Sequence, residues 1–368
     1  METGANGQQA GFAVNLCGRP ERAQQAELFN ACFKKQTKPE ALAWRYDLSP
    51  HGPSISLVTR TEGGQAVSGY ACSPRLVLAH GDLKTLAPLG ETGDVMTHPD
   101  WRKRGLFSAL DRAALTEAQA RGWPVVFGLP NRRSAHIFVE LGWKSVGTLR
   151  TWTFLFEADD AAREVRTREG RLRGFFTGFS VGSCARARRR ASARSAQIYA
   201  KKLDRFPSQV SSLARHVATR HAWMVRRDAE YLNWRFVDNP SRAHECVGLF
   251  TGDHRFVGYA IVQKPTHANP IGYLVDVLGL EESVEIAAVE AGLATLQSSG
   301  ASVAQATAVD GSWWAKQLES WGFLRPRPDN HLIVIVNVLD PTHPLAAVSM
   351  DPTRWYLTDG DRDDETMG

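Results

Sequence analysis

The feature that most constrains the fold is an order of strand-like and helix-like patterns that occurs twice along the chain. In the first half, a hairpin pattern around Thr61–Gly64 precedes a strand at Asp94–Thr97. A helix from about Leu106 to Arg121 then leads to a short strand and a second helix. In the second half, a hairpin around Thr251–Asp253 and a strand at Tyr273–Leu278 precede the same order of elements. The pattern predicts an α/β protein made of two similarly built domains.

The length of 368 residues also favours more than one domain, because a typical domain has about 100–150 residues. We expect the first domain at residues 1–157, the second at 196–340 and a C-terminal tail at 341–368. The segment 158–195 mixes arginines with Gly, Ala and Ser, and is predicted to be a basic linker, either a solvated connector or an anion contact. The acidic end of the tail lacks the spacing of a calcium loop and is expected to be solvated.

Composition excludes several classes of protein. The net charge of +5 is modest for this length, and the basic linker lacks the interleaved aromatic residues that stack on bases, so we expect no nucleic-acid partner. No apolar run reaches the ~18 residues of a membrane span, and the N-terminus has no secretory signal pattern, so we expect a cytoplasmic protein and no membrane partner. The 5 cysteines are scattered without a Cys-x-x-Cys pair, which argues against a structural metal site and a disulfide framework.

The most informative segment for function is Asp94–Ser108, where a strand enters a short basic turn that opens a helix. The first amide groups of a helix have no partner within it, and the helix dipole adds about half a positive charge there. Arg102, Lys103 and Arg104 add full charges, and Gly105 lets the backbone approach a ligand closely. The segment predicts a pyrophosphate-binding turn that is neither a Walker A loop nor a Gly-x-Gly-x-x-Gly turn.

Two blocks of this half resemble the GNAT superfamily of acyl-CoA-dependent N-acyltransferases. Residues 97–107 resemble the family signature, in which Val-x-Pro is followed, after two residues, by Arg/Gln-x-x-Gly-x-Gly/Ala; Thr97 stands in place of Val, and Phe107 in place of Gly or Ala. Residues 131–143 resemble the family's Asn-x-x-Ser/Ala helix and its closing Gly-aromatic pair. The resemblance implies two tandem GNAT-like domains, with mixed, mostly antiparallel sheets flanked by helices, acyl-CoA as co-substrate and no metal.

The resemblance also implies roles for the matched residues. The backbone of Val95, Met96 and Thr97 would pair with the pantetheine arm of CoA like an added strand, and the Met96 N–H would stabilise negative charge on the thioester oxygen. Asn131 and Ser134 would flank the pantetheine, although Asn131 suits a plain helix cap equally well. The full set expected to hold acyl-CoA is Val95, Met96, Thr97, Arg102, Lys103, Arg104, Gly105, Leu106, Phe107, Ser108, Asn131 and Ser134.

The acid–base groups depart from the family pattern. Many relatives carry a tyrosine that protonates the departing thiolate, and here that position is Phe138. Some relatives carry a glutamate four residues before the first pantetheine-pairing residue, and here that position is Glu91. On an alternating strand Glu91 shares a face with Gly93 and Val95, so Glu91 is the candidate general base, with a solvated loop carboxylate as the alternative.

The second half lacks the basic turn, because Glu281 and Glu282 at the corresponding helix start would repel a pyrophosphate. We therefore expect a degenerate GNAT-like domain that binds the acceptor substrate. Trp234 and Arg235 are candidates for contact with a base or sugar, with burial in one helix as the alternative. Asp276 is a candidate for orienting or deprotonating an amine.

The predicted activity is transfer of an acetyl or short hydroxyacyl group from CoA to a primary amine. Amines beside electron-withdrawing oxygens are neutral more often at pH 7 than lysine is, which favours a nucleotide-linked amino sugar. Tandem GNAT proteins with that acceptor resemble this chain in length and in having one intact turn. The alternatives are a protein-lysine or other small-amine acetyltransferase, and a non-catalytic CoA sensor or nucleic-acid-binding adaptor. The Gly-x-Ser-x-Gly pattern at Ser180 lies in the basic linker and so does not predict a serine hydrolase.

Overall fold

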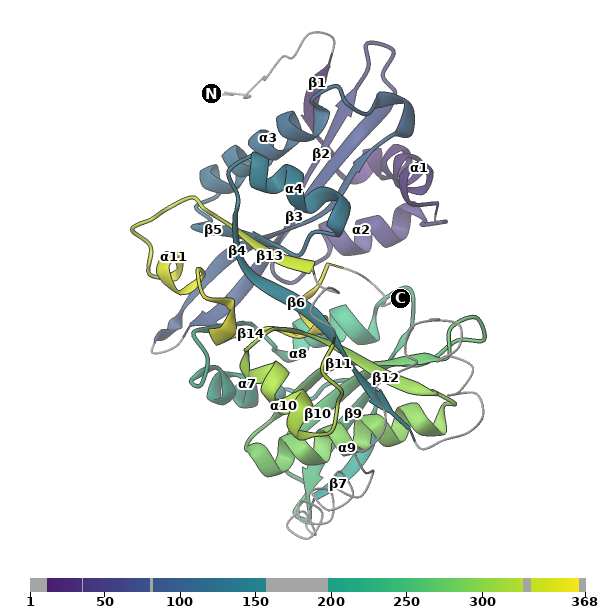
Figure 1. Cartoon of the computed structure of the whole chain (residues 1–368), viewed down its shortest axis with the longest axis vertical. Coiled ribbons are helices and arrows are strands. Elements are labelled where there is room, and N and C mark those ends of the chain that lie inside the picture. The colour runs from purple at the N-terminus through teal and green to yellow at the C-terminus, as the bar shows by residue number, and fades with distance from the viewer. Residues whose placement is uncertain (1–11, 35, 80–81, 157–197, 327–331, 364–368) are drawn as a thin grey trace. The chain divides into compact units, whose positions relative to one another are not determined.

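The computed structural model describes residues 12–34, 36–79, 82–156, 198–326 and 332–363. The predicted linker 158–195, including Ser180, lies outside them. The chain divides into two compact units (Figure 1). Unit 1 comprises Met1–Gly147 with Leu332–Pro352, and unit 2 comprises Thr148–His331 with Thr353–Gly368. These units differ from the expected domain ranges at two strands. The last strand of the first half, residues 144–155, pairs within unit 2, and the last strand of the second half, residues 332–338, pairs within unit 1.

Unit 1 contains a sheet with strand order β1-β2-β3-β4-β5-β13. Neighbouring strands are antiparallel, except that β4 and β5 are parallel. Its helices and strands are β1 (Ala13–Leu16), α1 (Arg22–Phe33), α2 (Pro39–Asp47), β2 (Ile55–Arg60), β3 (Ala66–Ala79), β4 (Asp82–Thr97), α3 (Leu106–Ala120), β5 (Val125–Gly128), α4 (Arg132–Glu140), β13 (Leu332–Val338) and α11 (Pro344–Val348). Short 3-10 turns lie at Arg19–Glu21 and Pro99–Trp101.

Apolar clusters cover both faces of this sheet. Leu110 and Ala114 are one helical turn apart on α3, so both face the sheet and pack with Tyr70 of β3. On the other face, residues of α1 and α2, such as Leu42, pack with Ala71 of β3. Because Tyr70 and Ala71 are consecutive strand residues, their side chains point to opposite faces, which separates α3 from α1 and α2.

Unit 2 repeats this arrangement with strand order β6-β12-β11-β10-β9-β7. Here β11 and β12 are the parallel pair, and the other neighbours are antiparallel. Its helices and strands are β6 (Lys144–Leu155), β7 (Ile198–Leu203), α7 (Val210–Ala218), β8 (Trp223–Val225), α8 (Ala229–Leu232), β9 (His244–Thr251), β10 (Phe256–Gln263), β11 (Ile271–Gly279), α9 (Glu282–Ser298), β12 (Val303–Val309), α10 (Trp313–Ser320) and β14 (Trp355–Tyr356). A π-helical turn at Asn233–Val237 follows α8, and a 3-10 turn, η5, lies at Asp359–Asp361.

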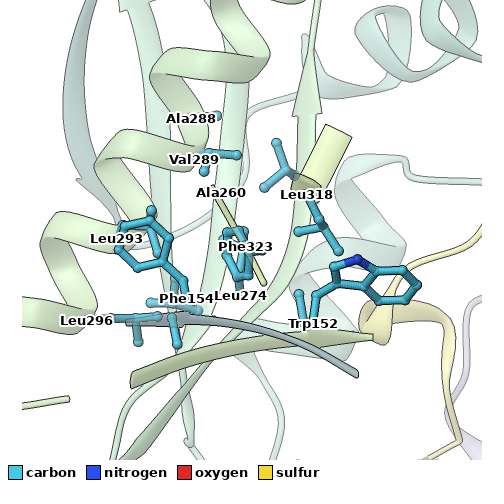
Figure 2. Packing of buried hydrophobic residues seen from close by; sticks show 14 of the residues in the cluster. Trp152, Phe154, Ala260, Leu274, Ala288, Val289, Leu293, Leu296, Leu318 and Phe323 are labelled. Carbon is cyan, nitrogen blue, oxygen red and sulfur yellow. The ribbon is translucent and has the colours of Figure 1, made fainter. Parts of the chain in front are cut away.

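The strand β6 follows α4 in sequence but belongs to the core of unit 2. It pairs antiparallel with β12, from Leu149 opposite Val309 to Leu155 opposite Val303. Its side chains Trp152 and Phe154 lie in the same buried cluster as residues of α9 and α10 (Figure 2). The burial of these two large aromatic side chains explains why the second sheet retains this strand.

The fold class predicted from the sequence is confirmed: mixed, mostly antiparallel sheets are flanked by helices. The sequence patterns missed α2 and underestimated the length of β3 and β4. Within the described residues, none of the helices combines the length and apolar character needed to cross a membrane, and none of the groupings of His, Cys, Asp and Glu could hold a metal ion.

The expectation of a solvated acidic tail was wrong for the part of the tail that the structure describes. Asp359 and Asp361 are only 2% and 1% exposed. The carboxylate of Asp361 lies 2.7 Å from the guanidinium of Arg227, which is also buried. A buried charge is tolerated when it is paired, so Arg227 allows this acidic segment to enter the core of unit 2.

Candidate active site

The connection from β4 to α3 in unit 1 is an exposed basic turn, residues 98–105, at the start of α3. Lys103 and Gly105 adopt positive φ values of 61° and 73°. A positive φ is easily adopted by glycine and is uncommon for lysine, so the turn carries some backbone strain at Lys103. Such strain is frequent where a loop is shaped to bind a ligand.

The start of α3 presents donors for an anion. The Ala109 amide bonds the Gly105 carbonyl at 3.1 Å, which opens the helical ladder, so the amides of residues 106–108 precede the first helical bond. The guanidinium of Arg104 lies 4.5 Å from the centre of the Trp101 ring, and the Arg102 side chain lies 3.4 Å from the Thr97 carbonyl oxygen. Exposed cations and unpaired amides at a helix N-terminus form an anion site of the kind that binds phosphate.

The strand β4 leaves its neighbour β5 before it reaches this turn. The parallel pairing joins Gly90, Glu91 and Thr92 to residues 126–128 and goes no further along β4. A bulge follows, because Gly69 lies opposite Met96 whereas Ala71 lies opposite Gly93. The last residues of β4 are therefore paired on the β3 side, and their other edge is not part of the β4–β5 ladder.

The ladder with β3 fixes which amides point to that other edge. The His98 amide bonds the Val67 carbonyl of the β3 edge at 2.9 Å. Backbone groups of an antiparallel strand alternate between its two edges, so Met96 faces β3 like His98, while Val95 and Thr97 face away. The expectation that the Met96 amide faces a thioester is therefore corrected: the register assigns that direction to Val95 and Thr97.

The side chain of Glu91 also lies differently from the expectation. Because the bulge adds a residue, Glu91 shares a face with Met96, and Val95 lies on the opposite face. Glu91 is 2% exposed and accepts a 2.6 Å hydrogen bond from Arg75. It is therefore not a solvated loop carboxylate, and its carboxylate is not exposed to a substrate amine either. A buried ion-paired carboxylate favours a structural role over that of general base.

Residues of α4 take structural positions. The side-chain oxygen of Asn131 accepts bonds from the amides of Arg133 and Ser134 at 2.9 and 3.1 Å, so Asn131 caps α4. Phe138 is 2% exposed and packs edge-on against Phe107 and Trp143. The position where relatives carry an acidic hydroxyl is therefore part of the apolar core.

In unit 2, only residues 280 and 281 join β11 to α9. A Cβ atom at Gly279 would lie 2.6 Å from the Glu285 amide, which shows how tightly the strand meets the helix. The Arg220 guanidinium occupies this helix start, where it contacts the Gly279 carbonyl at 3.3 Å and Glu285 at 3.1 Å. This helix start therefore lacks the room and the free positive charge of the turn at 98–105.

The C-terminal segment of unit 2 bonds both β11 and β12 beyond the point where these strands pair with each other. Their pairing ends at Tyr273 and Gln305. Farther along, the Tyr356 hydroxyl donates to the Val277 carbonyl of β11, and the Asp359 carboxylate accepts the Thr307 amide of β12 at 2.6 Å. The segment 356–361 thus bonds β11 and β12 of unit 2 beyond their mutual pairing, whereas in unit 1 the last residues of β4 continue beyond the β4–β5 ladder.

The substrate residues expected in this half are buried. Asp276 is 1% exposed and accepts bonds from Arg227, Tyr259 and Thr358 at 2.9, 2.8 and 2.8 Å. Trp234 and Arg235 are 7% and 3% exposed in the turn that follows α8. The geometry therefore favours the alternative of core packing for Trp234 and Arg235, and it removes Asp276 as an amine-binding group because its carboxylate is fully engaged.

Comparison with known proteins gives a family match within unit 1. Residues 18–146 match the family model described as an acetyltransferase (GNAT) domain. This stretch contains β4, the basic turn, α3 and α4. Residues 18–146 are therefore similar to a GNAT acetyltransferase domain, and the match supports an acyl-CoA-dependent N-acyltransferase.

Solved structures with a similar fold cover most of the chain. One is a probable N-acyltransferase from Enterococcus faecalis V583, with a TM-score of 0.61, 13% identity and coverage of 90% of this chain and 73% of that one. Another is N-myristoyltransferase from Saccharomyces cerevisiae with bound myristoyl-CoA, with a TM-score of 0.57, 13% identity and coverage of 89% and 79%. A third is a tandem GNAT protein from the clavulanic acid biosynthesis pathway, with a TM-score of 0.52, 12% identity and coverage of 90% and 100%. At these identities the likeness is one of fold, and it supports a tandem arrangement. The search of curated proteins gave no match.

Proposed function

We propose that unit 1 binds acyl-CoA and transfers an acetyl or short hydroxyacyl group to a primary amine. The observation that carries the proposal is the basic turn 98–105 immediately after the open edge of β4. The turn and the first amides of α3 would hold the pyrophosphate, with Arg102, Lys103 and Arg104 supplying positive charge. Val95 and Thr97 would pair with the pantetheine arm as an added strand.

The reaction follows from this placement. The neutral amine attacks the thioester carbonyl carbon, so a C–N bond forms and negative charge develops on the carbonyl oxygen. The Val95 amide on the open edge would stabilise that charge. The C–S bond then breaks and the CoA thiolate leaves with the bonding electron pair. The amine nitrogen gives its proton to water, which leaves the amide product, and the thiolate takes up a proton from water to give free CoA.

The proposed acceptor is an amine that is already neutral near pH 7. Glu91 is held in an ion pair and Phe138 has no hydroxyl, so neither expected position supplies acid–base help. A lysine-like amine loses about 4–5 kcal/mol to protonation at pH 7, whereas an amine with a pKa near 8 loses about 1–2 kcal/mol. An amino group on a sugar ring, as in a nucleotide-linked amino sugar, belongs to the second kind.

We further propose that unit 2 binds no acyl-CoA and serves the acceptor substrate. The tight turn at Gly279, the side chain of Arg220 and the segment 356–361 support this part of the proposal. Calorimetric titration of the full chain with acetyl-CoA should give one site per chain. A stoichiometry of two would contradict the proposal for unit 2, and an absence of binding to acetyl-CoA and longer acyl-CoAs would contradict the proposal for unit 1.

The acceptor is tested by CoA thiol release with a panel of amines. The panel contains amino sugars, nucleotide-linked amino sugars, small aliphatic amines and lysine-containing peptides. We expect the highest kcat/KM with the amines of lowest pKa. A preference for lysine peptides would instead identify a protein acetyltransferase and contradict the proposed acceptor.

A further inference from the structure

We propose that Asp94 is a positioning residue: by binding Arg45 and Tyr46 of α2, it fixes the bulge of β4 and so aims the amides of Val95 and Thr97 at the acyl thioester. The inference rests on the proposed function of unit 1. It adds a role for α2, whose residues the sequence patterns did not connect with β4.

The backbone of Asp94 marks the bulge. Its φ is 47°, and it lies between the pairs Gly93–Ala71 and Met96–Gly69, where β4 has one residue more than β3. Positive φ is uncommon for a residue with a Cβ atom, although Asp and Asn tolerate it better than most. A bulge redirects the residues that follow it, here Val95 and Thr97.

The side chain of Asp94 is held from one helix. Its Oδ2 atom accepts a hydrogen bond from the Arg45 guanidinium and another from the Tyr46 hydroxyl. The Asp94 and Arg45 side chains are only 14% and 10% exposed, and Tyr46 is 1% exposed. Burial, together with the charge of Asp94, raises the pKa of Tyr46 well above its usual value, so its hydroxyl remains a donor.

The helix that supplies these donors is itself well anchored. Arg22 of α1 lies 2.6 Å from Asp47 at the end of α2, and the Arg22 guanidinium stacks on the Tyr46 ring with 5.1 Å to its centre. Tyr46 and Leu42 also pack in the cluster that contains Met96. Met96 directly follows Val95, the residue that the bulge redirects. Helix α2 therefore contacts the bulge on both sides of Val95, through the carboxylate of Asp94 and through the side chain of Met96.

The alternative is that these contacts only stabilise unit 1. A register shift within β4 moves backbone donors from one edge of the strand to the other, so a small loss of order at the bulge would misdirect the Val95 amide. The proposed pyrophosphate turn, residues 98–105, follows this strand and lies outside the bulge. If Asp94 only stabilises unit 1, its loss should lower the melting temperature and leave kcat unchanged. If Asp94 positions the Val95 amide, its loss should lower kcat more than it weakens acyl-CoA binding.

The test compares Tyr46→Phe and Asp94→Gly with the control Glu117→Gln. Tyr46→Phe removes one donor, and Asp94→Gly keeps a residue that tolerates positive φ but removes the carboxylate. Glu117→Gln weakens a partly buried ion pair with Arg121 at the C-terminal end of α3 and leaves the contacts of Asp94 intact. We expect kcat, with the best acceptor of the panel, to fall about 10- to 100-fold in the first two variants. The Kd of acetyl-CoA should rise by a smaller factor, because the pyrophosphate contacts remain when the pairing of Val95 and Thr97 with the pantetheine is disturbed. The control should keep the kcat of the unaltered protein.

A second readout uses acetyl-CoA labelled with ¹³C at the thioester carbonyl. A hydrogen bond to that oxygen shifts the carbonyl resonance and its infrared band relative to free acetyl-CoA. We expect this shift in the unaltered protein and the control, and its loss in Tyr46→Phe and Asp94→Gly. If both variants keep kcat and the spectral shift, Asp94 has no positioning role, whatever the change in melting temperature. An unaltered protein that transfers no acyl group would instead refute the proposed function.

Discussion

Arg227 and Asp361 form an ion pair in unit 2, 2.7 Å apart and each with a side chain that is 1% exposed, although 134 positions separate them in the sequence. The same guanidinium binds Asp276 of β11 and stacks over the Tyr356 ring. Burial raises the pKa of Asp361, and the charge of Arg227 opposes that rise. This pair joins the end of the chain to the central strand β11.

Removal of Arg227 should therefore be severe. The substitution Arg227→Met leaves the Asp276 and Asp361 carboxylates buried without their shared cation, and should lower the free energy of unfolding by about 3–5 kcal/mol. The exposed pair of Arg205 with Asp238 offers a matched control, because Arg205→Met should cost less than about 1 kcal/mol. Urea unfolding measures both. Equal losses in the two variants would show that burial of the Arg227 pair has no special effect.

The basic turn should govern acyl-CoA affinity. Reversal of two exposed charges in Arg102→Glu with Arg104→Glu places negative charge beside the proposed pyrophosphate site, and should raise the Kd of acetyl-CoA about 10- to 100-fold. Arg112 is an exposed residue farther along α3, so Arg112→Glu is a control for charge reversal on the same helix. Calorimetry at constant ionic strength compares the variants. An unchanged Kd in the double variant would contradict the proposed pyrophosphate site.

The stability of unit 2 should fall in mild acid. His221 packs edge-on against the rings of Trp313 and Tyr356, and burial, with the charges of Arg220 and Arg227, lowers the pKa of His221 to about 4. The unfolded chain binds this proton at higher pH than the folded one, so stability is lost as pH falls from about 6.5 toward about 4. This group should account for a loss of about 2 kcal/mol between pH 7 and pH 5.

The variant His221→Phe isolates this contribution. Its ring can keep the aromatic contacts but cannot bind a proton, so its stability should change less between the two pH values, by about 2 kcal/mol. The pKa of His244 is also lowered to about 4, by burial first and by Arg235 second, and it contributes equally to both proteins. If urea unfolding gives the same pH dependence for both proteins, His221 does not titrate as described.

The close contact between the end of β11 and the start of α9 should make any side chain at Gly279, the last residue of β11, destabilising. In Gly279→Ala the new Cβ would lie 2.6 Å from the Glu285 amide, so backbone must shift, at a cost of about 1–3 kcal/mol. Gly252, in the hairpin between β9 and β10, has open space where a Cβ atom would lie, so Gly252→Ala should be close to neutral. Melting temperatures compare the two. A stable Gly279→Ala would indicate that this helix start is loose enough to rearrange.

Local patterns predicted the parts of the site that depend on local chemistry. Gly105 and the basic residues before it indicated an exposed turn at a helix start, and the structure has that turn. The placement of Glu91 failed because it assumed strict alternation along β4. The role of Met96, which the family resemblance implied, was assigned to an amide that faces β3. The bulge at Asp94 breaks that alternation, and the helix that holds it, α2, lacks a strong periodic signal.

The sequence by itself determined the α/β class, much of the order of elements in each half, the exposed basic turn and its absence from the second half, because periodicity, glycine and charge act over a few neighbouring residues. Only the tertiary structure decided that β6 and β13 lie in units other than those of the helices before them, and that Asp359 and Asp361 are buried. These outcomes depend on pairing between distant segments, where the burial of Trp152 and the charge of Arg227 outweigh local preference.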